Sequence, residues 1–208
     1  MRLCSICEKR PAKRDCPALA SMICSVCCAR DRMIKIKCPE ACEYLQAGRK
    51  SSIEKIGAER IRFIEQHGVP YDQKVAAGMR TMMIFEGSIV ETQRMEFKSL
   101  KDQDIAEGID TAIRTLSTFE SGLLYTHQAE TAAGQLVSEA ILKTVELIQR
   151  EADPARVPKP AELASLLKIF RIIVDFHLKR GSDGRDYIRF ISQFFPYPEE
   201  EKKSLIIT

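Results

Sequence analysis

Beyond residue 52, hydrophobic residues recur at steps of three and four along most of the chain, which is the pattern of amphipathic helices. The widest apolar stripe runs through residues 130–151. Similar stripes run through residues 104–120 and onward from Pro160, a residue that suits the first position of a helix. No run of alternating hydrophobic and polar residues after residue 45 indicates a strand. The pattern therefore predicts an all-α bundle.

The ends of this bundle carry clear start and stop residues. Isoleucines at helical spacing predict a helix that opens at a capping box formed by Ser51 and Glu54 and ends at Gly68. A short last helix is predicted in residues 187–195, before Pro196. With the segment between Gly68 and residue 104, the body is expected to hold five or six helices.

That remaining segment, residues 72–98, is rich in methionine and is interrupted by Gly78 and Gly87, so it is predicted as two shorter helices. Its methionines either fill the core or line a pliable groove for a partner helix. They are Met79, Met82, Met83 and Met95.

The cysteines and the charges divide the chain. All eight cysteines fall in the first 42 residues, and none occurs in the other 166. Residues 1–50 hold 11 Lys and Arg against 5 Asp and Glu, a net charge of +6, whereas the remainder holds 21 against 24, a net charge of −3. We therefore predict a Cys-rich finger in residues 1–45, a polar linker in 46–52 and a helical domain in 53–208.

The chain has neither a predicted membrane span nor a secretory leader. Its longest stretch without charged residues, 16–29, is shorter than the roughly 18 apolar residues that a bilayer requires. Basic residues occupy the positions where a leader would be apolar. The expected location is the cytoplasm.

Eight thiols in so short a segment leave three interpretations open: disulfides, an iron–sulfur cluster or zinc. Disulfides are disfavoured because cytoplasmic thiols stay reduced. The tight cysteine run of ferredoxins is missing. Zinc fits best, because closely spaced cysteine pairs can direct two sulfurs to one ion and eight ligands make two tetrahedral sites. The candidate ligands are Cys4, Cys7, Cys16, Cys24, Cys27, Cys28, Cys38 and Cys42.

These residues resemble the HIT-type zinc finger, a relative of MYND fingers. The likeness covers residues 1–45 and rests on Cys4-Ser-Ile-Cys7, on Cys16-Pro, on the run from Ile23 to Cys28 and on Cys38-x-x-x-Cys42. Two positions depart from the family pattern: Leu19 stands where a cysteine is usual, and Cys38 where a histidine is usual.

The resemblance implies a small treble or cross-brace finger with two interleaved zinc ions and a role in protein contacts. It places Cys4, Cys7, Cys24 and one of Cys27 or Cys28 on the first ion. The second ion would take Cys16, Cys38, Cys42 and the other member of that adjacent pair. Sites made only of thiolates leave no position for water or substrate, so such zinc is structural.

The basic residues of the finger allow a second interpretation. Lys and Arg side chains either offset the thiolates or contact nucleic acid or the ribosome. The residues that would make this contact are Lys9, Arg10, Lys13 and Arg14. Tyr44, the only aromatic residue of the finger, offers little for base stacking.

No catalytic or cofactor-binding residue is predicted. The three histidines, His67, His127 and His177, lack the spacing of metal-hydrolase motifs, and no phosphate loop or dinucleotide fingerprint occurs. We expect a mainly α, non-enzymatic zinc protein that acts as an interaction or assembly adaptor. The alternatives are a nucleic-acid-binding protein and a redox or iron–sulfur protein, and the oligomeric state stays open.

Overall fold

The computed structural model describes residues 2–33, 35–153 and 157–195. Within these ranges it holds seven helices and one two-stranded hairpin, so the chain is mainly α as predicted. The chain divides into two compact units, residues 1–59 (unit 1) and 60–208 (unit 2). The predicted helix stop at Pro196 lies outside the described residues. In the described ranges, no helix is long and apolar enough to cross a membrane.

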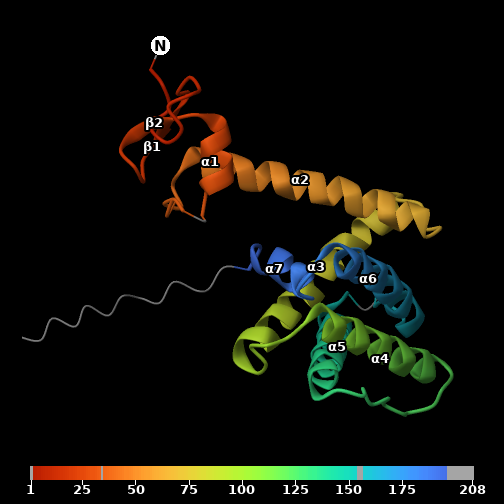
Figure 1. The fold of residues 1–208 in the computed structure, drawn as a ribbon. Coiled ribbons are helices and arrows are strands. Elements are labelled where there is room, and N and C mark those ends of the chain that lie inside the picture. The colour runs from red at the N-terminus through yellow and green to blue at the C-terminus, as the bar shows by residue number, and fades with distance from the viewer. Residues whose placement is uncertain (1, 34, 154–156, 196–208) are drawn as a thin grey trace, which may run out of the picture. The chain divides into compact units, whose positions relative to one another are not determined.

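Unit 1 begins with a hairpin that the sequence pattern did not predict. Strand β1 (Arg14–Cys16) pairs antiparallel with β2 (Ser21–Ile23), and Asp15 lies opposite Met22. The chain then enters helix α1 (Ser25–Asp31). The strands and α1 are drawn in red to orange in Figure 1.

Helix α2 (Glu43–Gln66) starts earlier than the capping box at Ser51 predicted, so that predicted start is wrong. The polar residues 46–52, predicted as a linker, lie inside this helix. Most of them are exposed, and several are good helix formers, so a polar run can continue a helix without a loop. The backbone N–H of Leu45 donates to Cys42 O at 3.0 Å, which begins the helical hydrogen bonding directly after the last cysteine. The predicted end is confirmed, because Gly68 takes a left-handed φ of 78° just after α2.

Helix α3 (Gln73–Met95) is a single helix, which corrects the expectation of two. The two glycines lie inside the helix, and at each one a neighbouring side chain packs against the backbone where a Cβ would otherwise be. A Cβ at Gly78 would lie 2.7 Å from Leu166 Cδ1, and one at Gly87 would lie 3.1 Å from Phe195 Cε1. Glycine here permits close packing rather than a turn.

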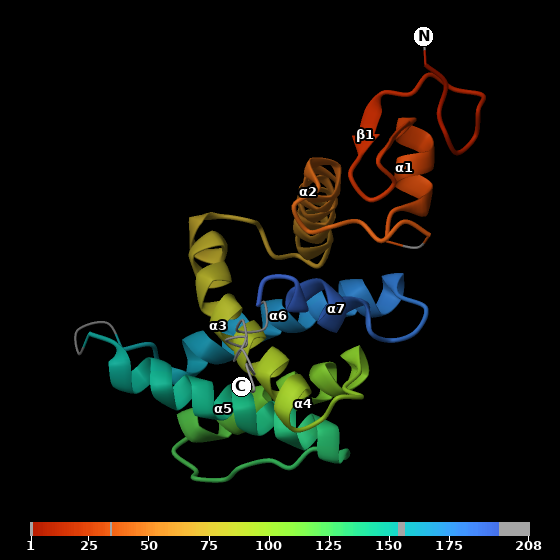
Figure 2. The same ribbon diagram turned by 90° about the vertical axis from the view of Figure 1, so that its left-hand side faces the viewer.

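The core of unit 2 is built around α4 (Asp102–Glu120), which packs against α5 (Ala132–Glu151) and α6 (Pro160–Arg180). Figures 1 and 2 show α4 beside α5 from two sides. The crossing is close at Gly108, where a Cβ would lie 2.5 Å from Val137 Cγ1. Pro160 is the first residue of α6, as predicted.

The short helix α7 (Asp186–Ser192) is held by buried polar contacts. Asp102 is fully buried and accepts hydrogen bonds from the backbone N–H groups of Tyr187 at 2.9 Å and Ile188 at 3.1 Å. The Tyr187 hydroxyl donates to Glu86 at 2.7 Å, and Arg60 lies 3.5 Å from the same carboxylate. These contacts give the buried Asp102, Glu86 and Tyr187 side chains hydrogen-bond partners of suitable chemistry.

Candidate metal centre

A tight turn places the first two cysteines. The Cys4 carbonyl accepts from Glu8 N at 2.8 Å, and the Cys4 N–H donates to Arg10 O at 2.9 Å, which closes the turn around Cys7. Glu8 completes it in the left-handed region at a φ of 53°. Ser5 N donates to Met22 O at 3.1 Å, so the turn is fixed to strand β2.

The hairpin and α1 place the next two cysteines. Cys24 follows β2 directly and is the N-cap of α1, and its sulfur accepts the backbone N–H of Cys27 at 3.4 Å. Residues three apart lie on the same face of a helix, so Cys27 points the same way as Cys24. The sulfur of the adjacent Cys28 instead contacts the guanidinium of Arg14.

The structure thus brings four cysteines together: Cys4, Cys7, Cys24 and Cys27 have sulfur atoms that all lie within 4.8 Å of one another. Cys7 Sγ and Cys24 Sγ are 4.0 Å apart. Three of the four are buried, Cys7 is partly buried, and all are free thiols.

These sulfur positions fit one zinc ion. Zn–S bonds of about 2.3 Å in a tetrahedron place neighbouring sulfurs roughly 3.8 Å apart. In a four-iron cluster each thiolate binds a different iron, which would hold the sulfurs further apart. Thiolate is also the ligand that a soft or borderline cation prefers. The N-terminal part of the chain therefore has the donor set of a single zinc site.

The surroundings of the four thiols favour some thiolates over others. Burial opposes ionisation of Cys4, but backbone hydrogen bonds from Cys24, Cys7 and Ile6 outweigh it and lower its pKa to about 6. The backbone hydrogen bond from Cys27 lowers the pKa of Cys24. Burial and the neighbouring sulfurs raise the pKa of Cys27 to about 12. A cation at the centre would offset the mutual repulsion of these sulfurs.

The other four candidate ligands do not form a second cluster of this kind. Cys16, Cys28 and Cys42 are buried and Cys38 is partly buried. Among the described residues, the four of the first set are the only group of three or more metal-ligating side chains whose ligand atoms all lie within 4.8 Å of one another. Cys28 instead accepts a hydrogen bond from Arg14 Nη1 at 3.2 Å.

The basic residues of unit 1 differ in their surroundings. Lys9, Arg10 and Lys13 are exposed. Arg14 is partly buried, because besides its contact with Cys28 its guanidinium lies 4.9 Å from the centre of the Tyr44 ring. Arg14 and Tyr44, which could each stack on a nucleic-acid base, thus stack on each other instead.

The three histidines belong to unit 2. His67 follows the last turn of α2, and its Nδ1 lies 2.8 Å from Phe63 O. His127 Nε2 lies 3.0 Å from Thr118 Oγ1. His177 is fully buried, with Nδ1 2.6 Å from Asp186, and burial lowers its pKa to about 4.

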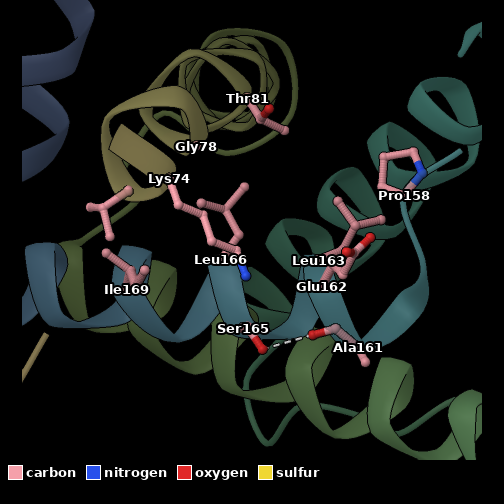
Figure 3. A pocket seen from close by; sticks show the side chains of 11 residues that line it. Lys74, Gly78, Thr81, Pro158, Ala161, Glu162, Leu163, Ser165, Leu166 and Ile169 are labelled. Carbon is pink, nitrogen blue, oxygen red and sulfur yellow. Dashed lines mark hydrogen bonds between the residues drawn. The ribbon is translucent and has the colours of Figure 1, made fainter. Parts of the chain in front are cut away.

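Unit 2 also contains an apolar pocket that the sequence did not reveal. It lies between α3 and α6, has a volume of about 510 Å³, and is lined mainly by aliphatic side chains such as Val75, Leu166 and Ile169. Lys74 of α3 and Glu162 of α6 are also among the lining residues, and both are labelled in Figure 3. One charge of each sign gives the pocket no net preference for a cation or an anion.

Comparisons of the chain with protein-family models, curated proteins and solved structures give no match.

Proposed function

We propose that this chain is a non-enzymatic zinc protein that acts as a protein–protein interaction or assembly adaptor. The observation that carries the proposal is the grouping of four thiols, Cys4, Cys7, Cys24 and Cys27, around one point. Four thiolates complete a tetrahedral shell, so bound zinc would have no position for water or substrate and would serve to hold unit 1 together. Thiolate ligands also suit a reducing compartment such as the cytoplasm.

The proposal includes a second zinc ion, as in the HIT-type cross-brace finger. Its ligands would be Cys16, Cys28, Cys38 and Cys42, which are buried or partly buried within unit 1. Cys16, Cys28 and Cys38 belong to the same packed cluster as the first four cysteines. Binding of this ion would require the four side chains to draw together.

Exposed apolar side chains on unit 1 support a role in protein contacts. Leu3, Leu19, Val26 and Met33 are each between 43% and 57% exposed. Large aliphatic side chains gain free energy when a partner covers them. Because the packed cluster of this unit is built largely from cysteines, these residues are not needed to complete it.

Nucleic-acid binding is the second candidate, favoured by the exposure of Lys9, Arg10 and Lys13. Basic side chains of this kind bind phosphates, and binding of that type weakens steeply as salt rises. A mobility-shift titration with mixed RNA and DNA at low and high salt separates the two candidates. A salt-sensitive shift that is lost in a Lys9→Gln/Arg10→Gln/Lys13→Gln variant would favour nucleic acid over the adaptor.

The adaptor role is tested with a matched pair of cysteine variants. Cys27→Ser removes a ligand of the observed cluster, whereas Cys28→Ser changes the adjacent residue and leaves that cluster complete. Native mass spectrometry should find the first ion lost in Cys27→Ser and retained in Cys28→Ser. A protein captured by the wild-type chain, once purified, should bind it directly and should bind Cys27→Ser at least about tenfold more weakly, because the contact surface unfolds. Substrate turnover that survives purification and is lost in a point variant would contradict a non-enzymatic role.

A further inference from the structure

A cleft separates the C-terminal half of α3 from the middle of α5 within unit 2. Its volume is about 610 Å³. The α3 wall includes Glu91, Met95 and Glu96, and the α5 wall includes Leu136, Glu139 and Leu147. The cleft is thus bounded by two helices of the same unit and is partly open to solvent.

The floor and edges of this cleft are suited to an apolar surface. Met95 is 78% exposed and Leu147 is 38% exposed, although both lie on helices that bury their other faces in the core. The hydroxyl groups of two threonines on the walls already donate their hydrogen bonds and cannot donate to an occupant of the cleft. Thr92 donates to Ser88 O at 3.0 Å and Thr144 donates to Ala140 O at 2.8 Å, each within its own helix.

The charged residues around the cleft are mostly acidic. Glu91, Glu96 and Glu139 face one basic residue, Lys143. Among the described residues, none of these carboxylates has an ion-pair partner, and Glu139 accepts only from Gln135 at 2.7 Å. Helix α3 ends at Met95, so the negative end of its dipole adds to this potential. The cleft therefore favours a cationic occupant.

We propose that the cleft between α3 and α5 docks a basic amphipathic helix of a partner protein. The helix would place leucine or methionine side chains against Met95, Leu136 and Leu147 and lysine or arginine side chains against the flanking glutamates. The flexible Met95 can adapt to such side chains. The pocket between α3 and α6 has no such preference for a cation, because its lining carries one charge of each sign. This inference deepens the proposed adaptor role and rests on it.

The test is a selection from displayed 16-residue segments. Each position is drawn from Leu, Met, Ala, Gln, Lys and Glu, and the target is the zinc-loaded full chain. The selected segments should be net positive, with Leu or Met repeated at steps of three and four. In the Glu91→Gln/Glu139→Gln variant their affinity should fall about tenfold, because two rim ion pairs are lost.

A matched control changes the same number of charges elsewhere on unit 2. Glu65→Gln/Glu120→Gln alters two exposed carboxylates away from the cleft and should leave the affinity unchanged. Met95→Gln should weaken binding without changing the charge. The inference is overturned if no segment is selected, if the selected segments are acidic, or if the cleft variants bind as the control does. It is also overturned if only Ser165→Glu, in the other pocket, weakens binding.

The outcome is separable from that of the proposed function. The Cys4→Ser chain loses the zinc site of unit 1 but retains every residue of the cleft. Selected segments should bind this variant as they bind the wild type. If the segments bind Cys4→Ser normally and Cys27→Ser still binds the captured partner protein, the docking cleft is supported and the zinc-dependent adaptor role is refuted. If the segments do not bind the cleft and Cys27→Ser loses the captured partner protein, only the docking cleft is refuted.

Discussion

Removing the metal should unfold unit 1 and leave most of unit 2 helical. Of the seven buried residues that pack together in unit 1, five are cysteines, and the other two are Ile23 and Ile36. Without a metal to join the sulfurs, so few aliphatic side chains cannot offset the conformational entropy of the unit. Unit 2 contains no cysteine and has its own core, centred on α4.

The size of the effect follows from the helix lengths. Helix α1 has 7 residues, and α2 has 24 residues that begin in unit 1 and continue into unit 2. If only α1 unfolds, about a twentieth of the helical signal is lost, and if the unit 1 part of α2 unfolds with it, the loss is about a fifth.

The assay is circular dichroism at 222 nm on the full chain in reducing buffer, before and after a zinc chelator and again after zinc is restored. A loss within these bounds that zinc reverses is the expected result. Loss of nearly all helical signal would show that the two units fold as one cooperative body, and an unchanged spectrum with the metal fully removed would show that zinc is not structural.

Three further predictions concern unit 2. Asp102→Ala leaves two buried N–H groups of α7 unpaired and should cost about 3 kcal/mol in urea unfolding, whereas a loss below about 1 kcal/mol would contradict this capping role. Gly108→Ala forces a methyl group to within 2.5 Å of Val137 and should destabilise the chain by about 1 kcal/mol net of helix propensity, whereas Gly57→Ala, with open space around it, should stabilise by a similar amount. His177 has a pKa of about 4 in the folded chain against 6.5 ordinarily, so only the unfolded chain takes up its proton as the pH falls below 6.5. Stability should therefore drop by about 3 kcal/mol between pH 7 and pH 4, and the drop should be smaller in His177→Phe; equal pH dependence of the two chains would refute this origin.

The helical body could be predicted from the sequence because its apolar stripes are wide and its ends carry turn residues. Gly68 and Gly122 both take left-handed φ values at helix ends. The exceptions have local physical reasons. Gly78 resembles a helix breaker, but its missing Cβ makes room for Leu166, which lies 88 residues later in the chain. A contact so distant in sequence leaves no trace in a periodic pattern.

The sequence predicted a metal site made of cysteines, but it did not determine all four ligands of the first ion. The resemblance to the HIT-type finger implied that Cys4 and Cys7 act with Cys24, and it left the choice between Cys27 and Cys28 open. The structure separates these two, because the Cys27 sulfur lies within 4.8 Å of the other three, whereas Cys28 Sγ accepts from Arg14. The hairpin that brings Cys24 to the first turn has strands of three residues, too short to show a clear alternation.

The division of the methionines could not be predicted, since helical spacing does not say which side of α3 is covered. Met82 is 2% exposed and fills the core, whereas Met95 is 78% exposed at the edge of the cleft. The core interpretation thus holds for Met82, whereas Met95 is exposed, as the groove interpretation requires.

X-ray absorption spectroscopy at the zinc edge tests the central claim most directly, because it reports the atoms bound to the metal in the intact, zinc-loaded chain. The account predicts a single shell of four sulfur atoms at about 2.3 Å from zinc. A nitrogen or oxygen neighbour at about 2.0 Å would reveal a coordination position open to water or substrate and would contradict a closed structural site.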